Sequence, residues 1–195
     1  MTLTAMALGR MNLAKQAALV LAGSLLIAVA AQVSVPFFPV PMTLQTLAIL
    51  FVGFAYGSRL GAATVTAYLL EGAVGAPVFA NFANGAAFAG PTAGFLVGFV
   101  GVAWIAGLAT DRGITSPIKL SFVGILASAL LYIPGLAWPM GVAAAMGIEV
   151  WGADLAFGPL TQAFVTPFLL GDVVKAVLAA LLVSGGLAWL KRRAA

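Results

Sequence analysis

One acidic and one basic residue, Asp172 and Lys175, stand three positions apart inside a long apolar run of this 195-residue chain. A helix would place both side chains on one face. A charge inside a membrane helix costs about 3 kcal/mol or more unless it is paired or hydrated. The pair therefore indicates either a pocket, in which Lys175 meets an anionic group such as a carboxylate and Asp172 orients it, or a self-neutralising pair that reaches toward water and binds nothing.

Three amide side chains are further candidates for ligand recognition, because a carboxamide offers both donors and an acceptor. Asn81 and Asn84 lie in an apolar connection, and Gln45 lies near the start of an apolar run. Each also has a structural interpretation. Asn84 precedes a glycine and could form a turn, Asn81 could cap a helix, and Gln45 could join two helices by a hydrogen bond.

Other chemistry has little support in the sequence. The chain has no Cys and no His, which excludes disulfides, thiol nucleophiles and the usual transition-metal ligands. No lysine follows the glycine of a phosphate-binding loop. Asp172 is the one carboxylate expected well inside a span. Glu71 is expected to be solvated, and Tyr68 and Tyr132 are expected to pack or to lie at the interface. We therefore expect no metal site and no enzyme.

The elements that must position these residues follow from the charge layout. Hydrophobic residues make up 63% of the chain and charged residues 7%. Eight of the nine basic residues fall in four clusters between apolar runs: Arg10 with Lys15; Arg59; Arg112 with Lys119; and Lys191, Arg192 with Arg193. The turns between these clusters hold no basic residue. This alternation is typical of a polytopic membrane protein, and basic residues so dispersed do not suggest nucleic acid binding.

We predict an all-α integral membrane protein with one domain, residues 1–195, six transmembrane helices and both termini in the cytoplasm. A span needs roughly 20 apolar residues, and we place the six at Leu13–Val35, Met42–Tyr56, Leu60–Gly72, Thr92–Thr110, Ile118–Pro134 and Pro167–Leu190. The second and third are short and could form a re-entrant hairpin. The last helix is expected to begin at Thr166-Pro167. We expect the first run to be a span and not a cleaved signal peptide.

Three connections lie on the side expected to be external. Residues 36–41 hold three prolines and favour an extended path. Residues 73–91 are too apolar to extend into water, so we expect them to fold over the helices as a lid. Residues 135–164 carry two Trp residues that suit the membrane interface, and part of this segment could be an interfacial helix.

Small residues recur four apart in three places, where helices can approach closely in lipid. These are Ala14, Ala18 and Ala22; Gly53, Gly57 and Gly61; and Gly94 and Gly98. Each series could serve packing inside the bundle or docking of another membrane subunit. The alanine series is the better docking candidate, because a terminal helix tends to lie at the edge of a bundle.

Four segments in order resemble the BioY family, the biotin-specific substrate-binding (S) components of energy-coupling factor (ECF) vitamin transporters. They are Pro41–Ala48, Gly75–Phe79, Gly90–Phe95 and Gly171–Lys175, and the similarity spans about Met11 to Leu190. One departure is Ala93, which stands where the commoner family pattern has Gly.

The resemblance implies a six-helix protein of the cell membrane that binds biotin near the external face and needs no cofactor. Asp172 and Lys175 would serve the acidic end of the vitamin. The lid would close over the ligand, with Asn84 as its polar residue and Phe79 as a further binding residue, whereas Asn81 falls where many relatives have Gly.

The same resemblance maps the docking motif of the family onto Ala14, Ala18 and Ala22. The implied partners are a transmembrane coupling subunit and two ATP-binding subunits, which would explain the missing phosphate loop. Two other functions stay open from the residues alone: a small membrane enzyme acting on a lipid or vitamin precursor, and a structural assembly subunit.

Overall fold

The computed structural model describes residues 2–9, 11–38 and 40–194. Its helices are α1 Leu3–Leu8, α2 Leu13–Gln32, α3 Gln45–Tyr56, α4 Ser58–Ala73, α5 Ala93–Asp111, α6 Pro117–Ala137, α7 Ala143–Ala145, α8 Phe157–Phe164 and α9 Leu169–Ala194. The strands β1 Ser34–Val35 and β2 Met42–Thr43, the 3-10 turns η1 Ala80–Phe82 and η2 Gly85–Ala89, and the π-turn η3 Trp138–Val142 complete the described elements.

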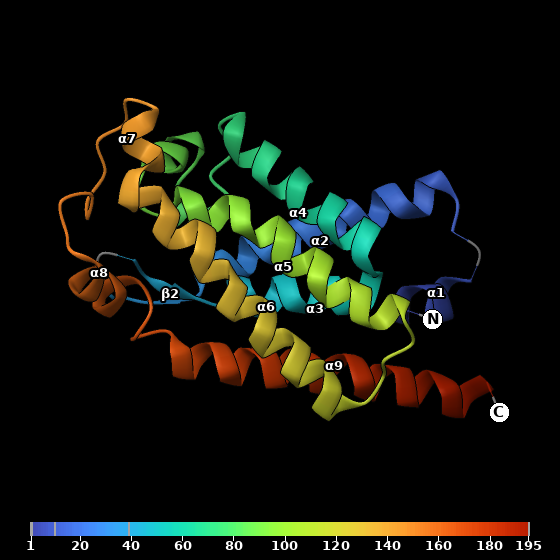
Figure 1. The fold of residues 1–195 in the computed structure, drawn as a ribbon. Helices are drawn as coiled ribbons and strands as arrows, with labels where there is room; N and C mark the ends of the chain where they lie inside the picture. Colours follow the sequence, from blue (N-terminus) through green and yellow to red (C-terminus); the bar gives the residue numbers. More distant parts are fainter. Residues whose placement is uncertain (1, 10, 39, 195) are drawn as a thin grey trace.

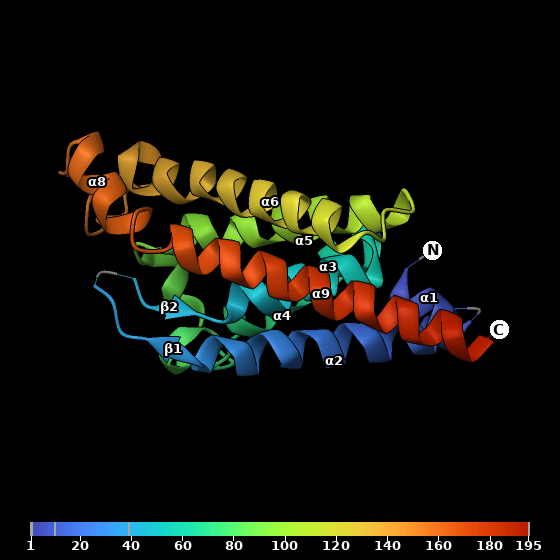
Figure 2. The ribbon, with the colours of Figure 1, turned by 90° about the horizontal axis from the view of Figure 1, so that it is seen from below.

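The long helices lie side by side as an elongated bundle (Figure 1). Both chain termini lie at one end, which we call the terminal end. The hairpin of β1 and β2 lies with α8 at the opposite end (Figures 1 and 2). We call it the cavity end, because its side chains line a cavity. The chain therefore crosses the bundle repeatedly from one end to the other, as expected for a membrane protein with several spans.

Four of the described helices are long and apolar enough to cross a membrane by length and composition. They are α2, α5, α9 and a fourth helix that consists of α6 and its continuation to Ala145. A mostly helical chain with four such helices has the character of an all-α membrane protein. The second and third predicted spans correspond to α3 and α4, of 12 and 16 residues, which are shorter than the roughly 20 residues that cross a bilayer without help.

Several predicted helix ends are wrong. The first span was expected to reach Val35 and the second to begin at Met42, but these two residues pair as antiparallel strands. The prolines between them keep the chain extended. The last helix begins at Leu169, because the Thr166 amide closes the turn that ends α8 by donating to Thr161 O. In contrast, α6 continues through Pro134 to Ala137.

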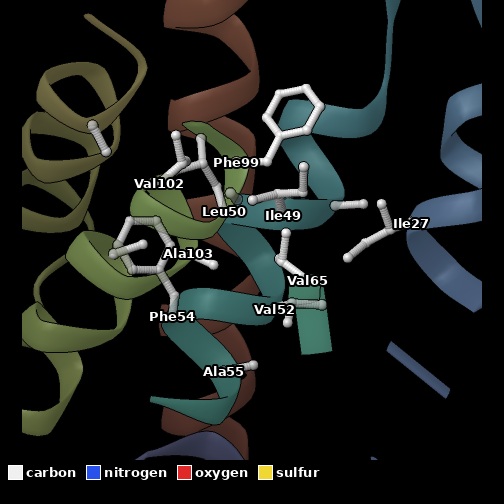
Figure 3. Close-up of a cluster of buried hydrophobic side chains, with 14 of the residues drawn as sticks. Ile27, Ile49, Leu50, Val52, Phe54, Ala55, Val65, Phe99, Val102 and Ala103 are labelled. Carbon is white, nitrogen blue, oxygen red and sulfur yellow. The ribbon is translucent and has the colours of Figure 1, made fainter. Parts of the chain in front are cut away.

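The core surrounds α3, which is the most enclosed helix of the bundle. Nine of its 12 residues are buried, whereas α2 buries four of 20. Figure 3 shows Ile49, Leu50 and Phe54 of α3 among side chains from α5, including Phe99 and Val102. The first turn of α3 is thereby fixed in the middle of the cavity end.

The glycine series serve packing inside the bundle. A Cβ on Gly61 would lie 3.1 Å from Gly53 Cα, and one on Gly53 would lie 2.8 Å from Ala106 Cβ, so α3, α4 and α5 touch there. A Cβ on Gly98 would lie 2.8 Å from Pro134 Cγ of α6. Bulk at these positions would force the helices apart.

The alanine series has a different surrounding. Ala14, Ala18 and Ala22 are all exposed along α2. This exposed face of α2 can contact either lipid or another subunit. Docking of a subunit on it therefore stays a prediction.

Basic residues gather at the terminal end. Lys15, Arg59 and Lys119 stand near the starts of α2, α4 and α6, Arg112 follows α5, and Lys191 to Arg193 end α9. All of these helix ends lie at the terminal end (Figure 1). Arg10 of the first cluster lies outside the described residues. Lys175 is the one described basic residue at the cavity end.

Candidate functional site

A cavity of about 290 Å³ lies at the cavity end of the bundle. Its walls come from α3, α5, α6 and α9, and it is covered by the hairpin loop, by the end of α8 and by residues 73–91. These last residues fold over the helices as predicted, and we keep the name lid for them. A partly enclosed space of this size suits one small molecule.

The predicted pair lies in this cavity. Asp172 stands in the first turn of α9, and Lys175 follows one turn later, with Nζ 3.6 Å from Asp172 Oδ1. Asp172 is 9% exposed and Lys175 6% exposed. The pair therefore does not reach into water, and both side chains line the cavity.

Two further side chains hold the pair in place. The Tyr132 hydroxyl of α6 donates to Asp172 Oδ2 at 2.5 Å, and Lys175 Nζ donates to Thr46 Oγ1 of α3 at 3.3 Å. An ammonium has three donors. In the described part of the chain Thr46 takes one of them, and Asp172 Oδ1 lies at ion-pair distance. The ammonium therefore keeps donors for a ligand in the cavity, so the arrangement can bind an anionic group such as a carboxylate.

Gln45 also lines the cavity, but its amide is already engaged. Its Nε2 donates to Tyr68 OH at 2.7 Å, and its Oε1 accepts from Thr43 Oγ1 at 3.0 Å. The Tyr68 hydroxyl in turn donates to Val78 O at 3.1 Å. Gln45 therefore joins two helices by a hydrogen bond, which was the structural alternative to ligand binding. Through Tyr68 of α4, this bond connects α3 to the base of the lid.

The two lid asparagines are placed differently. Asn81 lines the cavity and has a positive φ of 56°. Asn84 is not part of the cavity lining. It precedes η2, where its carboxamide oxygen accepts from the Ala86 amide at 3.3 Å, as a capping residue does. The ligand-binding role of Asn84 stays a prediction.

Phe79 anchors the lid to the bundle and forms part of the cavity wall. It is 2% exposed, and its ring packs edge-on against Tyr68 and Phe88 at 5.3 and 5.5 Å. Its ring also fills the space where a Cβ on Gly72 would stand. The lid backbone is thus held close to α4 at this point.

The rest of the wall is aromatic and apolar. Phe95 of α5 stacks on Phe164 of α8 with ring centroids 6.2 Å apart and an interplanar angle of 6°, and its ring also meets Tyr132 edge-on at 6.1 Å. Phe168 follows Phe164 by one turn and lines the same wall. A charged group at one side, a few neutral polar side chains and flat apolar surfaces suit a small amphipathic acid.

Several cavity residues were not predicted from the sequence, among them Tyr132, Thr46, Phe164 and Phe168. Tyr132 was expected to pack or to lie at the interface, yet it donates to Asp172 from 40 positions away. Thr46 directly follows the candidate residue Gln45, and this was the one local sequence signal that could have indicated its place in the cavity. The aromatic pair is spaced for one helical face, but it falls where α8 ends and a turn begins.

Two acidic residues outside the cavity also have defined roles. Glu71 was expected to be solvated, but its Oε1 accepts from the buried Ser24 Oγ of α2 at 2.8 Å. Asp111 Oδ2 accepts from Ser58 N and Ser58 Oγ at 2.9 and 2.6 Å, so the end of α5 caps the start of α4. No group of three acidic side chains suited to a metal ion occurs among the described residues.

Comparison with known proteins gives consistent matches. The model of the BioY family matches residues 3–192. A biotin transporter BioY of Thermotoga maritima is 37% identical over 158 residues, which cover 80% of this chain and 86% of that protein. A biotin transporter BioY of Rhizobium etli is 37% identical over 153 residues, which cover 77% of this chain and 79% of that protein.

A solved structure shares the fold. It is the crystal structure of the S-component for biotin from an ECF-type ABC transporter, with a TM-score of 0.69. The match covers 90% of this chain and 93% of that chain at 20% identity.

Proposed function

Because this chain belongs to the BioY family, we propose that it captures biotin in the cell membrane as the S component of an ECF-type vitamin transporter. The relatives carry the name of biotin transporters, and the shared fold is that of a biotin S-component. The observation in this chain that supports the proposal most directly is the buried Lys175 ammonium, which faces an apolar cavity of suitable size. Membership of the BioY family favours a transport function over that of a small membrane enzyme.

Biotin has a carboxylate at the end of an aliphatic chain and a ureido group on its ring system. We assign the carboxylate to Lys175, with Asp172, Tyr132 and Thr46 fixing the position of the ammonium. The aliphatic chain and the rings would lie against the aromatic wall. The ureido group needs both donor and acceptor partners, which Asn81 of the lid can supply.

The proposed topology has a single transmembrane domain, residues 1–195, six spans and both termini in the cytoplasm. The gathering of basic residues at the terminal end supports this orientation. The cavity and the lid would then face the outside, where the vitamin is captured. Helices α3 and α4 would complete the six spans within the bundle despite their length.

The chain would depend on partners for energy. A transmembrane coupling subunit and two ATP-binding subunits would supply it, since the sequence contains no phosphate-binding loop. The exposed series Ala14, Ala18 and Ala22 on α2 is the proposed docking face for the coupling subunit.

The direct test is mass spectrometry of the purified protein for a co-purifying ligand, followed by calorimetric titration of ligand-free protein with biotin in detergent. We expect biotin to be released on denaturation and to bind one molecule per chain. A different released vitamin, together with no heat on adding biotin, would contradict the assignment.

A further inference from the structure

Besides Tyr68, which bonds to Val78 O at the base of the lid, two further side chains from outside the lid hold it to the bundle. Near its end, Trp138 Nε1 donates to Gly90 O at 3.0 Å. In its middle, the carboxamide of Gln32, the last residue of α2, makes two bonds. Its Nε2 donates to Phe79 O at 3.0 Å, and its Oε1 accepts from the Phe82 amide at 3.0 Å. Gln32 thus pairs with both ends of one short turn across 47 to 50 positions of sequence.

This turn is closed by two backbone hydrogen bonds of its own, from Phe79 N to Ala83 O and from Ala83 N to Ala80 O, and Gln32 adds support from outside. Asn81 and Phe82 both have positive φ angles, 56° and 57°. Such angles are uncommon for residues other than glycine, above all for a bulky one. The Phe82 side chain is 69% exposed, so packing contributes little to holding it there. The bonds from Gln32 to the backbone on both sides compensate for this strained conformation.

The strained turn faces the cavity on one side. Asn81 and Phe79 line the cavity, whereas Gln32 does not belong to the lining. The Gln32 amide is itself oriented by a third bond, since Nε2 also donates to Ala28 O at 3.1 Å within α2. A side chain fixed in α2 therefore sets the position of two cavity residues in the lid.

We propose that Gln32 is a positioning residue for ligand capture, which holds residues 79–82 of the lid in the closed position through its carboxamide. The proposal rests on the proposed function for the identity of the ligand. Release of the ligand then requires the Gln32 bonds to break and the turn to leave the cavity.

The test compares three variants with the wild type. Gln32→Ala removes both bonds to the lid. Gln32→Glu keeps the acceptor for the Phe82 amide and loses the donor to Phe79 O. Gln16→Ala is the matched control, because Gln16 is exposed near the other end of α2.

The two measurements are amide hydrogen exchange of residues 79–83 in ligand-free protein and the dissociation rate of biotin. For Gln32→Ala we expect faster exchange in this segment and a dissociation rate about ten- to thirtyfold higher, the factor for two ordinary side-chain hydrogen bonds. Gln32→Glu should protect the Phe82 amide and dissociate at an intermediate rate. Gln16→Ala should match the wild type in both, and the melting temperatures should stay close together.

Unchanged exchange in Gln32→Ala would overturn the proposal whether or not the protein binds biotin. Faster exchange with an unchanged dissociation rate would also overturn it, because the bonds would then order the loop without holding the ligand. If the wild type binds no biotin, the proposed function fails separately. The dissociation rate is then measured with the ligand that co-purifies. Unchanged exchange, or faster exchange with an unchanged dissociation rate, would again overturn the role of Gln32.

Discussion

Replacement of Lys175 by alanine should weaken biotin binding strongly. The substitution removes the cation that faces the ligand carboxylate, and it leaves Asp172, which is 9% exposed, with Tyr132 as its remaining described partner. Truncating one member of a buried, hydrogen-bonded charge pair costs about 2–5 kcal/mol. Since 1.4 kcal/mol is a factor of ten, the dissociation constant should rise about 30- to 5,000-fold.

Calorimetric titration in detergent with both biotin and its neutral amide separates a contact with the ligand from a general disturbance. The wild type should prefer the acid strongly, and Lys175→Ala should lose this preference. Lys175→Arg should be intermediate, because a planar fork replaces a compact ammonium poorly. Lys119→Ala serves as the control, since Lys119 is exposed at the terminal end.

A double variant guards against misfolding as an explanation. Asp172→Asn with Lys175→Met removes both charges and leaves no unpaired ion in the bundle, so it should fold about as stably as the wild type. It should still fail to distinguish biotin from the amide. Wild-type affinity in Lys175→Ala, or an equal loss of affinity for acid and amide, would refute the assignment of Lys175 to the carboxylate.

Three further experiments test the rest of the site and the proposed docking face. Tyr132→Phe removes the donor to Asp172 and should weaken binding by about 1–3 kcal/mol in the same titration; an unchanged affinity would mean that the Tyr132 bond does not help to fix the pair. Asn81→Asp should bind biotin less well than Asn84→Asp, because aspartate caps η2 as well as asparagine does; the reverse order would return the ureido group to Asn84. Ala18→Leu should abolish ATP-driven uptake by the assembled complex and leave biotin binding by the isolated chain unchanged; loss of both would place this face inside the bundle.

The membrane class and the charged pair could be predicted from local sequence. Apolar runs interrupted by basic clusters indicate a helical membrane protein, because basic side chains stay on one side of a bilayer. Asp172 and Lys175 share a face because they are three residues apart on one helix. Prolines likewise indicated the extended path that became the β1–β2 connection.

The partners of that pair and the placement of the lid could not be predicted in the same way. Lys175 meets Thr46 across 129 positions, and Gln32 meets the lid across 47. Such contacts depend on which helices are neighbours and how each is rotated. Asn81 and Asn84 are equivalent in type, and the positive φ at Asn81 and the cap at Asn84 distinguish them only in the folded lid.

What the sequence by itself determined is therefore the chemistry of each helix face, and the tertiary structure decided which face meets which. In a water-soluble bundle, the apolar stripe of a helix would mark its buried side. Here α2 and α3 are both apolar all round, yet four of 20 residues are buried in one and nine of 12 in the other. Since lipid tails are as apolar as the core, hydrophobicity does not distinguish the two, and packing of small residues and a few hydrogen bonds sets the arrangement.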